Sequence, residues 1–302
     1  MNINELQKSF ALPGHATIAA GHGGLTTIMV ANAAASAEIT LLGGHILSFT
    51  PTGQRDLLWV SPASPFEPGT AIRGGVPLCW PWFGAHATNP ALPLHGFART
   101  ADWSLKAITA DGPNRTRVTL SLADSSASRA LWNQRFALTL QVTIGASLEI
   151  ALTTRNVGAE PFTISQAIHT YFNISHVGNV TITGYDGVDY VDKVGGANRP
   201  DRQVGDITIN REIDAVFQNC PGASAILDTG FKRRLTIAKQ GSNSAVVWNP
   251  WIEKAKKLSG YTPESYQTMV CVETCNALED ARTILPGAEH CLKTIISSSR
   301  LG

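Results

Sequence analysis

Large apolar side chains alternate with polar or small ones along much of this 302-residue chain. Between Phe136 and Ile144 every second residue is a large apolar one, and the alternation resumes at Leu148 after a turn at residues 145–147. Successive side chains of a β-strand point to opposite faces of a sheet, so this pattern predicts an antiparallel hairpin with one buried face. Similar patterns predict strands at residues 26–30, 38–42, 118–122, 179–182, 235–238, 245–248 and 291–296.

Clusters of glycine, proline and asparagine separate these stretches, an arrangement typical of a β-sandwich or β-barrel. Helices are predicted at residues 4–11 and 251–258, and residues 124–128 are predicted to form a loop. Strands and helices do not alternate, which argues against a parallel α/β sheet. We therefore expect an all-β fold, a large antiparallel β-sandwich with few short helices. Because no linker, repeat or low-complexity tract interrupts the sequence, residues 1–302 are expected to form one domain.

The composition excludes several classes of protein. Apolar residues make up 43 % and the formal net charge is +1, whereas a disordered chain combines low hydrophobicity with high net charge. The 24 Lys and Arg are matched by 23 Asp and Glu, so the basic surplus of a nucleic-acid-binding protein is missing. We find no apolar run of about 18 residues that could span a membrane, and no secretory leader. The five cysteines are too sparse for a disulfide framework, which favours a reduced, cytoplasmic protein.

Residues 71–84 are rich in glycine, proline and aromatic side chains and cannot form a regular strand throughout. An ordered loop of this kind can line a pocket, and Arg73 could hold an anionic group there by bidentate hydrogen bonds. The alternative is an aromatic plug in the core with a surface arginine. In residues 92–99, His95 and Arg99 could face the same cavity, or both could be exposed to solvent.

Two further titratable residues lie in apolar, strand-like surroundings. His169 is either a hydrogen-bonded core histidine or a general acid or base, since its ordinary pKa lies near working pH. An ionised Glu273 is costly there unless it is paired or faces a cleft, so it is a candidate base or the structural partner of an arginine. Cys271, Glu273 and Cys275 share one side of the strand, but a second ligand pair with zinc spacing is missing, so no metal site is predicted. Phosphate-loop, dinucleotide and Gly-x-Ser-x-Gly signatures are absent as well.

Taken in order, several segments together resemble the aldose 1-epimerase superfamily, and most closely its glucose-6-phosphate 1-epimerase (hexose-6-phosphate mutarotase) branch. The resemblance extends over about residues 20–297 and is carried by residues 72–77, 80–84, 94–99, 169–172, 247–251 and 272–273. It implies a β-sandwich of the galactose mutarotase type with the sugar bound on one concave sheet. It further implies interconversion of the α and β anomers of a hexose 6-phosphate, without a metal or an organic cofactor.

The same resemblance implies roles for individual residues. Glu273 would take the proton of the C1 hydroxyl and His169 would protonate the ring oxygen. We expect Glu273 to start ionised and His169 protonated, because their mutual attraction favours that state. General acid and base groups each contribute about 10²–10⁴-fold to a rate.

The remaining implied roles concern substrate binding. Arg73 and Arg99 would bind the phosphate, His95 would hydrogen-bond the sugar, and Asp214 would bind a sugar hydroxyl. One of the tryptophans at positions 248 and 251 would pack against the sugar face. Leu94 stands where some relatives have a glutamine that contacts substrate, which leaves the preferred hexose open.

Two other functions remain as alternatives. A mutarotase for unphosphorylated aldoses would not need the two arginines, Arg73 and Arg99. A non-catalytic carbohydrate-binding or sensor module on the same fold would not need both His169 and Glu273. The expected partner is a small-molecule sugar phosphate, with no nucleic acid and no membrane, and the sequence leaves the oligomeric state open.

Overall fold

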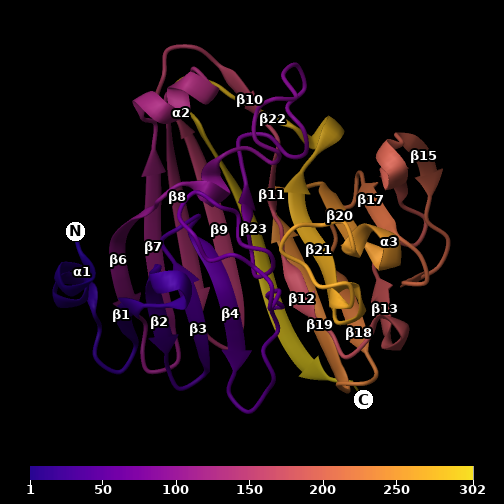
Figure 1. Ribbon diagram of the computed structural model, residues 1–302, viewed down its shortest axis with the longest axis horizontal. Coiled ribbons are helices and arrows are strands. Elements are labelled where there is room, and N and C mark those ends of the chain that lie inside the picture. The colour runs from indigo at the N-terminus through magenta and orange to yellow at the C-terminus, as the bar shows by residue number, and fades with distance from the viewer. Residues whose placement is uncertain (302) are drawn as a thin grey trace.

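The computed structural model describes residues 1–301 and confirms an all-β fold of antiparallel sheets with few short helices (Figure 1). The largest sheet has nine strands. In spatial order it contains β16 (Ile207–Thr208), β13 (Val180–Thr183), β18 (Ser224–Asp228), β19 (Arg233–Gln240), β23 (Glu289–Arg300), β9 (Ser147–Asn156), β8 (Phe136–Ile144), β7 (Thr116–Ala123) and β6 (Ser104–Ala110).

The second sheet has eight strands. In spatial order it contains β15 (Arg199–Arg202), β14 (Asp189–Asp192), β17 (Ile213–Phe217), β20 (Ser244–Asn249), β21 (Met269–Asn276), β11 (Gln166–Ile168) and β5 (Leu78–Cys79), with β12 (Tyr171–Asn173) also paired to β21.

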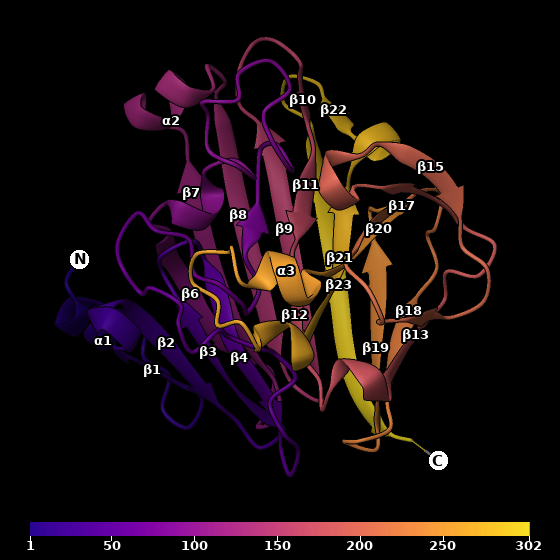
Figure 2. The same cartoon turned by 45° about the vertical axis from the view of Figure 1, so that its right-hand side comes forward.

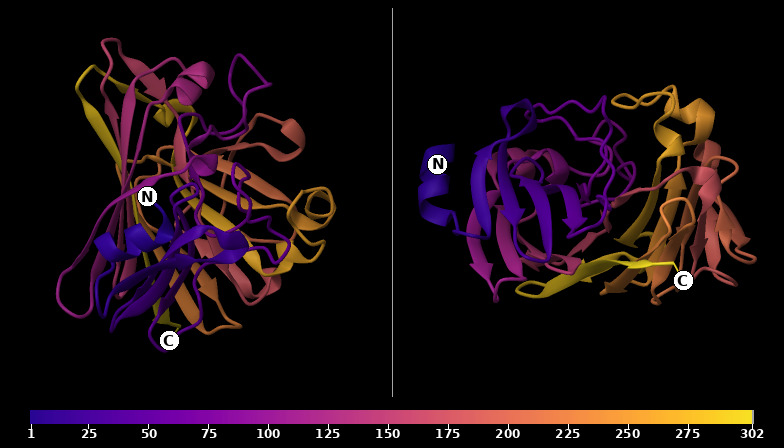
Figure 3. Two further views of the ribbon diagram at one scale, coloured as in Figure 1. Left: turned by 60° about the vertical axis from the view of Figure 1, so that its left-hand side comes forward. Right: turned by 90° about the horizontal axis from the view of Figure 1, so that it is seen from below.

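Two smaller sheets and three α-helices complete the described part of the chain. The four-stranded sheet contains β1 (Ala16–Ala20), β2 (Thr26–Ala31), β3 (Ala35–Thr40) and β4 (His45–Pro51), and the two-stranded one contains β10 (Phe162–Ile164) and β22 (Arg282–Ile284). The helices are α1 (Ile3–Phe10), α2 (Ser126–Leu131) and α3 (Trp251–Ala255). Figure 3 shows the N-terminal sheet at one end of the molecule, away from the orange strands near the C-terminus.

The hydrophobic core lies between the two large sheets. Phe217, Val247 and Val272 of the eight-stranded sheet and Leu140 and Ile296 of the nine-stranded sheet belong to one buried cluster. Because side chains alternate along a strand, every second residue of β17, β20 and β21 points away from this core. That outer face lies beneath α3 and the turn that follows it (Figure 2), and it provides the floor of the cleft described below.

The alternation of apolar residues located most of the predicted strands. The strand predicted at 136–144 has the same bounds as β8, and burial along it alternates as expected up to Val142. The strand predicted at 38–42 is displaced, because β3 ends at Thr40 and the chain then enters a turn at Gly43 and Gly44, both with positive φ.

The helix predictions were less accurate. The prediction at residues 4–11 is confirmed by α1, but α3 is shorter than the 251–258 expected. The loop predicted at 124–128 is wrong, because Ser125 and Ser128 form a capping box that begins α2. Ser128 N donates to Ser125 Oγ at 3.2 Å, and Ser125 N donates to Ser128 Oγ at 2.9 Å. Among residues 1–301, no helix is long and apolar enough to cross a membrane.

Candidate active site

Strand register brings together His169 and Glu273, which lie 104 positions apart in the sequence. β11 pairs with β21, with Ile168 opposite Thr274, and β12 continues in the same register after a break of two residues. His169 is the first residue of that break and therefore lies opposite Glu273. Directly opposed side chains on neighbouring strands share one face of the sheet, so both point to the outer side.

The two side chains are buried and close together. His169 Nε2 lies 3.3 Å from Glu273 Oε1, and the side chains are 10 % and 1 % exposed. The imidazole stacks on the ring of Tyr171 at 4.8 Å between centroids, with the edge of Trp248 nearby. Neither His169 Nδ1 nor Glu273 Oε2 has a hydrogen-bond partner among the described residues. Glu273 is therefore not the structural partner of an arginine, and His169 is not a hydrogen-bonded core histidine.

Burial acts on this pair in the direction opposite to that expected from sequence. It raises the pKa of Glu273 well above its ordinary value, and the charge of Asp214 adds to the rise. It lowers the pKa of His169 well below its ordinary value, assisted by His95 and Arg99. Burial thus favours an uncharged pair, whereas the expected ion pair depends on attraction across 3.3 Å. In both arrangements the pair holds one proton, and burial widens the pH range over which it does so.

A cleft of about 830 Å³ opens over the pair. All six residues singled out from sequence line it: Arg73, His95, Arg99, His169, Asp214 and Glu273. They come from β17, β21, the break between β11 and β12, and the two irregular segments near residues 73 and 95–99. The structure thus brings all six candidates into one space, although they span 200 positions of the sequence.

Among the described residues, no carboxylate neutralises the positive charge of the two arginines. Arg73 Nε donates to the carbonyl oxygen of Ser259 at 3.2 Å, and Arg99 Nη2 donates to that of Leu94 at 2.7 Å. Within residues 1–301 neither guanidinium has a carboxylate within ion-pair distance. Held by neutral carbonyls, both groups can hydrogen-bond an anion in the cleft.

His95 has a defined tautomer. Gly84 N donates to His95 Nδ1 at 3.1 Å, and His95 N donates to the Gly84 carbonyl at 2.7 Å. Burial, with Arg99 and Arg73 nearby, lowers the pKa of His95 to about 3. The ring is therefore neutral with its proton on Nε2, which makes it a hydrogen-bond donor and not an acid at neutral pH.

The floor of the cleft combines one carboxylate with one tryptophan. Asp214 on β17 lies opposite Trp248 on β20, and both line the cleft. Lys254 Nζ lies 3.6 Å from Asp214 Oδ2, so this carboxylate is partly neutralised. Of the two tryptophans considered, only Trp248 lines the cleft, because Trp251 packs against Tyr266 instead.

Residues 71–84, the segment rich in aromatic side chains, lie partly in the core and partly along the cleft. The pocket-lining interpretation and the core-plug interpretation therefore each hold for part of the segment. Trp80 is fully buried against Phe136 in the core, whereas Trp82 and Phe83 line the cleft. Leu94 lies at the rim with 53 % of its surface exposed. Its apolar side chain therefore faces the cleft where a glutamine would offer hydrogen bonds.

Sequence reasoning missed several cleft residues. The hydroxyl of Tyr261 donates to that of Tyr171 at 2.9 Å, which places a phenol pair beside the imidazole. Lys193 and Lys254 add two cations to the lining of the cleft. Tyr171 could have been found from its place two residues after His169, but nothing in the local sequence distinguishes the lysines from surface residues.

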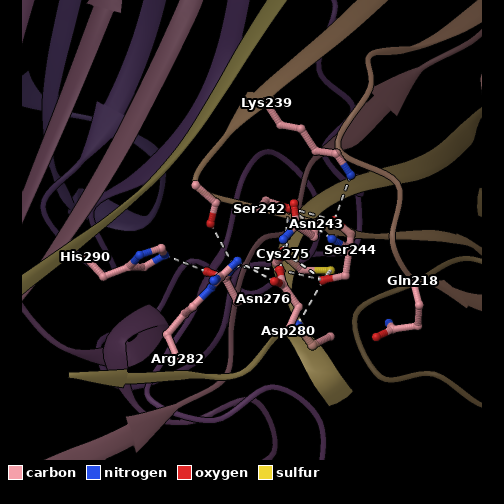
Figure 4. A network of polar contacts seen from close by, with 12 residues as sticks. Gln218, Lys239, Ser242, Asn243, Ser244, Cys275, Asn276, Asp280, Arg282 and His290 are labelled. Carbon is pink, nitrogen blue, oxygen red and sulfur yellow. Dashed lines mark hydrogen bonds and ion pairs between the residues drawn. The ribbon is translucent and has the colours of Figure 1, made fainter.

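A buried polar network lies on the other face of β21 (Figure 4). Gln166 Nε2 donates to Asn276 Oδ1 at 2.9 Å, and the two residues are directly opposed in the β11–β21 ladder. His290 Nε2 donates to the same oxygen at 3.0 Å, and Asn276 Nδ2 donates to Asp280 Oδ2 at 2.8 Å. Because these partners lie only three residues from His169 and Glu273, the network fixes the register on which the pair depends.

Residues 26–297 match the family described as aldose 1-epimerase. The chain belongs to this family. A Salmonella typhimurium relative named "Putative glucose-6-phosphate 1-epimerase" is 36 % identical over 253 residues, which cover 84 % of each chain. An Escherichia coli relative of the same name is 33 % identical over 276 residues, covering 91 % of this chain and 92 % of that protein. Membership in the aldose 1-epimerase family implies that a sugar is the substrate.

Solved structures agree with this assignment. The crystal structure of a "putative mutarotase (YeaD)" from Salmonella typhimurium is 31 % identical and covers 99 % of each chain with a TM-score of 0.89. A galactose mutarotase-like protein from Lactobacillus casei is 13 % identical, with a TM-score of 0.72 over 90 % of this chain and all of that one. The second likeness concerns the fold alone. The galactose mutarotase-like sandwich expected for an aldose 1-epimerase is confirmed.

Proposed function

We propose that this protein interconverts the α and β anomers of a hexose 6-phosphate, with glucose 6-phosphate as the first substrate to test. One observation carries the proposal. The cleft contains both a one-proton acid–base pair, His169 and Glu273 at 3.3 Å, and two guanidinium groups that have no carboxylate partner in the described part of the chain. The names of the Salmonella typhimurium and Escherichia coli relatives support the same substrate.

The reaction requires proton transfer at two oxygens of the sugar. In ring opening the bond between C1 and the ring oxygen breaks, while a base takes the proton of the C1 hydroxyl and an acid protonates the ring oxygen. After rotation about C1–C2 the aldehyde is attacked on its other face, and both transfers run in reverse. The catalyst must therefore hold one proton at the start and again at the end.

The pair satisfies this requirement with Glu273 as base and His169 as acid. Burial favours the proton on Glu273 in the free site, so its transfer to His169 produces the reactive ion pair. Glu273 then accepts the C1 hydroxyl proton while His169 gives its proton to the ring oxygen. Because the 3.3 Å separation exceeds that of a charge-assisted hydrogen bond, about 2.7–2.9 Å, both groups can turn toward substrate oxygens. Each transfer contributes about 10²–10⁴-fold to the rate.

Binding is assigned to the rest of the cleft. Arg73 and Arg99 would bind the phosphate dianion, and the Nε2–H of His95 would donate to a sugar oxygen. Asp214 would accept from a sugar hydroxyl, and the indole of Trp248 would pack against the apolar face of the ring. The phosphate contact separates this proposal from a mutarotase of free aldoses.

We also propose that the protein works in the cytoplasm and that residues 1–302 form one domain. All five cysteines are free thiols, which fits a reducing compartment. A single buried cluster includes residues from both large sheets, which supports one folding unit.

The test is anomeric exchange measured by NMR on the purified protein. Wild type should accelerate exchange of glucose 6-phosphate far more than that of glucose, and E273Q should abolish the acceleration. Equal acceleration of both sugars would favour a mutarotase of unphosphorylated aldoses. Tight binding of glucose 6-phosphate without acceleration would favour a sensor module and contradict the proposal.

A further inference from the structure

A third chemically reactive side chain lies beside the acid–base pair. Cys271 precedes Glu273 by two residues on β21 and therefore shares its face of the sheet. Ligand atoms of His169, Cys271 and Glu273 all lie within 4.8 Å of one another, and all three residues are buried. Cys275, which the sequence also placed on this face, has its Sγ 3.2 Å from Ser244 Oγ and does not belong to the cluster.

The spacing of these atoms is close to that of a tetrahedral zinc site. With Zn–N of about 2.0–2.1 Å and Zn–O of about 2.0–2.2 Å, a tetrahedral ion holds nitrogen and oxygen about 3.3 Å apart. His169 Nε2 and Glu273 Oε1 are 3.3 Å apart. A Zn–S distance of about 2.3 Å requires sulfur about 3.5 Å from each of them, and side-chain rotation within the 4.8 Å limit can provide this.

The second polar atom of each of these two side chains lacks a partner within the described chain. His169 Nδ1 and Glu273 Oε2 make no hydrogen bond, although each belongs to an almost fully buried side chain. The cluster is thus not a closed structural network. His169 and Glu273 line the cleft, so an ion can reach them from solvent, whereas Cys271 is fully buried beside them and does not line the cleft.

We infer that His169, Cys271 and Glu273 form an inhibitory site for a thiophilic divalent cation such as Zn²⁺, bound in competition with the sugar. The fourth ligand position faces the cleft and is open to water. An ion held there occupies both members of the acid–base pair, so the proton they share is displaced and neither can act on substrate. The inhibition, though not the metal binding, rests on the function proposed above.

The charges of such a complex balance. One Zn²⁺, one thiolate and one carboxylate sum to zero, with a neutral imidazole as third ligand, which suits a buried position. The free cluster holds two protons, one on the Cys271 thiol and one shared by His169 and Glu273, and both are released to solvent on binding. Affinity for the metal should therefore increase with pH.

Surrounding charges set the strength of the site. Asp214 on the neighbouring strand favours a cation, whereas Arg73 and Arg99 oppose it. Sugar and metal exclude each other because both require His169 and Glu273, whereas the positive charge of the two arginines only weakens metal binding. The titratable and charged groups that face the cluster are Arg73, Cys79, His95, Arg99, Tyr171, Asp214, Lys254 and Tyr261.

The first experiment titrates Zn²⁺ into the anomer-exchange reaction of wild type, C271A and C271S. Each variant is compared with its own metal-free rate. Wild type should be inhibited competitively with glucose 6-phosphate and restored by EDTA. Losing an outer-shell partner of a metal ligand costs about 10–100-fold in affinity, so losing the ligand itself should weaken inhibition at least tenfold. C291A removes the exposed cysteine and should be inhibited as wild type is.

The second experiment does not depend on activity. Co²⁺ replaces Zn²⁺ as a spectroscopic probe and should give a sulfur-to-metal charge-transfer band in wild type and C291A but not in C271A or C271S. Equal Zn²⁺ inhibition of wild type and C271S, or the absence of the band in wild type, would overturn the site. A band without any exchange activity would support the metal site and contradict the proposed function, so the two failures are distinguishable.

Discussion

His45 Nε2 donates to the carbonyl oxygen of Gly74, the residue after Arg73, at 2.7 Å. His45 is fully buried, and burial lowers its pKa to about 4, so it is neutral at physiological pH with its proton on Nε2. Gly74 and Gly75 both have positive φ, and a Cβ on Gly75 would lie 2.8 Å from His45 Nε2. The imidazole therefore supports the turn that carries Arg73, the first of the two arginines proposed to bind phosphate.

Replacing His45 should affect phosphate recognition more than chemistry. H45A leaves a buried carbonyl unsatisfied, which costs about 1–3 kcal/mol of stability, and it loosens the turn at Arg73. We expect KM for glucose 6-phosphate to rise about tenfold with kcat little changed, and exchange of glucose to be unaffected. H45Q keeps an N–H donor and should recover part of the loss. A parallel fall in kcat for both sugars would instead indicate a purely structural role.

Substitution of Glu273 should separate activity from stability. E273Q should lower exchange by about 10²–10⁴-fold, because the base is lost. Since burial raises the pKa of Glu273, the unfolded chain loses this proton above its ordinary pKa of about 4.3 while the folded protein retains it. The free energy of unfolding of wild type therefore falls as pH rises from the ordinary pKa of glutamate to the raised pKa of Glu273. In E273Q the free energy of unfolding should depend less steeply on pH, as chemical denaturation at several pH values would show. An unchanged slope would show that Glu273 ionises normally.

The pH profile of exchange should report the one-proton state of the pair. Burial lowers the pKa of His169, so gain of a second proton, which ends activity, should occur well below pH 6.5. It raises the pKa of Glu273, so loss of the last proton should occur well above pH 4.5. We expect a broad plateau, measured by NMR with glucose to avoid phosphate titration. A fall in activity centred on the ordinary histidine pKa would contradict this.

The two arginines should control discrimination between phosphorylated and free sugar. A hydrogen bond to a charged group contributes about 1.5–3 kcal/mol, so R73M and R99M should each raise KM for glucose 6-phosphate about 10–100-fold. Exchange of glucose should change little. R155M, at an exposed position of β9, provides a matched loss of one charge. It should leave both KM for glucose 6-phosphate and the exchange of glucose unchanged. Equal losses with both sugars would place the arginines outside phosphate binding.

Opposed residues of the buried network should differ sharply in their contribution to stability. Gln166 makes one side-chain hydrogen bond and leaves its own Oε1 without a partner, so Q166M should change the free energy of unfolding by less than about 1 kcal/mol. The side chain of Asn276 is hydrogen-bonded to Gln166, His290 and Asp280. N276L should therefore lower the free energy of unfolding by about 3 kcal/mol or more. Chemical denaturation measures both. Similar losses for the two variants would show that the network acts as one unit.

The sequence located elements where periodicity was long and sites where residue types were unusual. The alternation from Phe136 to Ile144, which resumes at Leu148 and continues to Leu152, is long enough to identify both strands of the hairpin. Arg73, His95 and Glu273 were found because arginine beside two glycines, histidine in an irregular loop and a carboxylate in an apolar strand are unusual. Helix α2 was missed because its capping box consists only of serines.

The spatial relationships could not be read from the sequence. The opposition of His169 and Glu273 depends on the register between β11 and β21, which long-range hydrogen bonds and the buried Gln166–Asn276 pair determine. Burial favours an uncharged His169 and Glu273 over the ion pair expected from sequence, and no local pattern reveals the extent of that burial. Lys193 lines the cleft because of the conformation of its loop, which no sequence pattern indicates.

Alternate residues of the same strands have two different tasks. Those on one face of β21 form the polar network that fixes the register, and those on the other face include the acid–base pair. Val216 and Val246 lie in the same cross-strand row as Glu273 and face the cleft, with no part in the polar network. Evolution can therefore reshape the walls of this cleft by exchanging every second residue of β17 and β20, while the scaffold that aligns the proton donors and acceptors stays intact. New sugar preferences can then arise without a new catalytic apparatus.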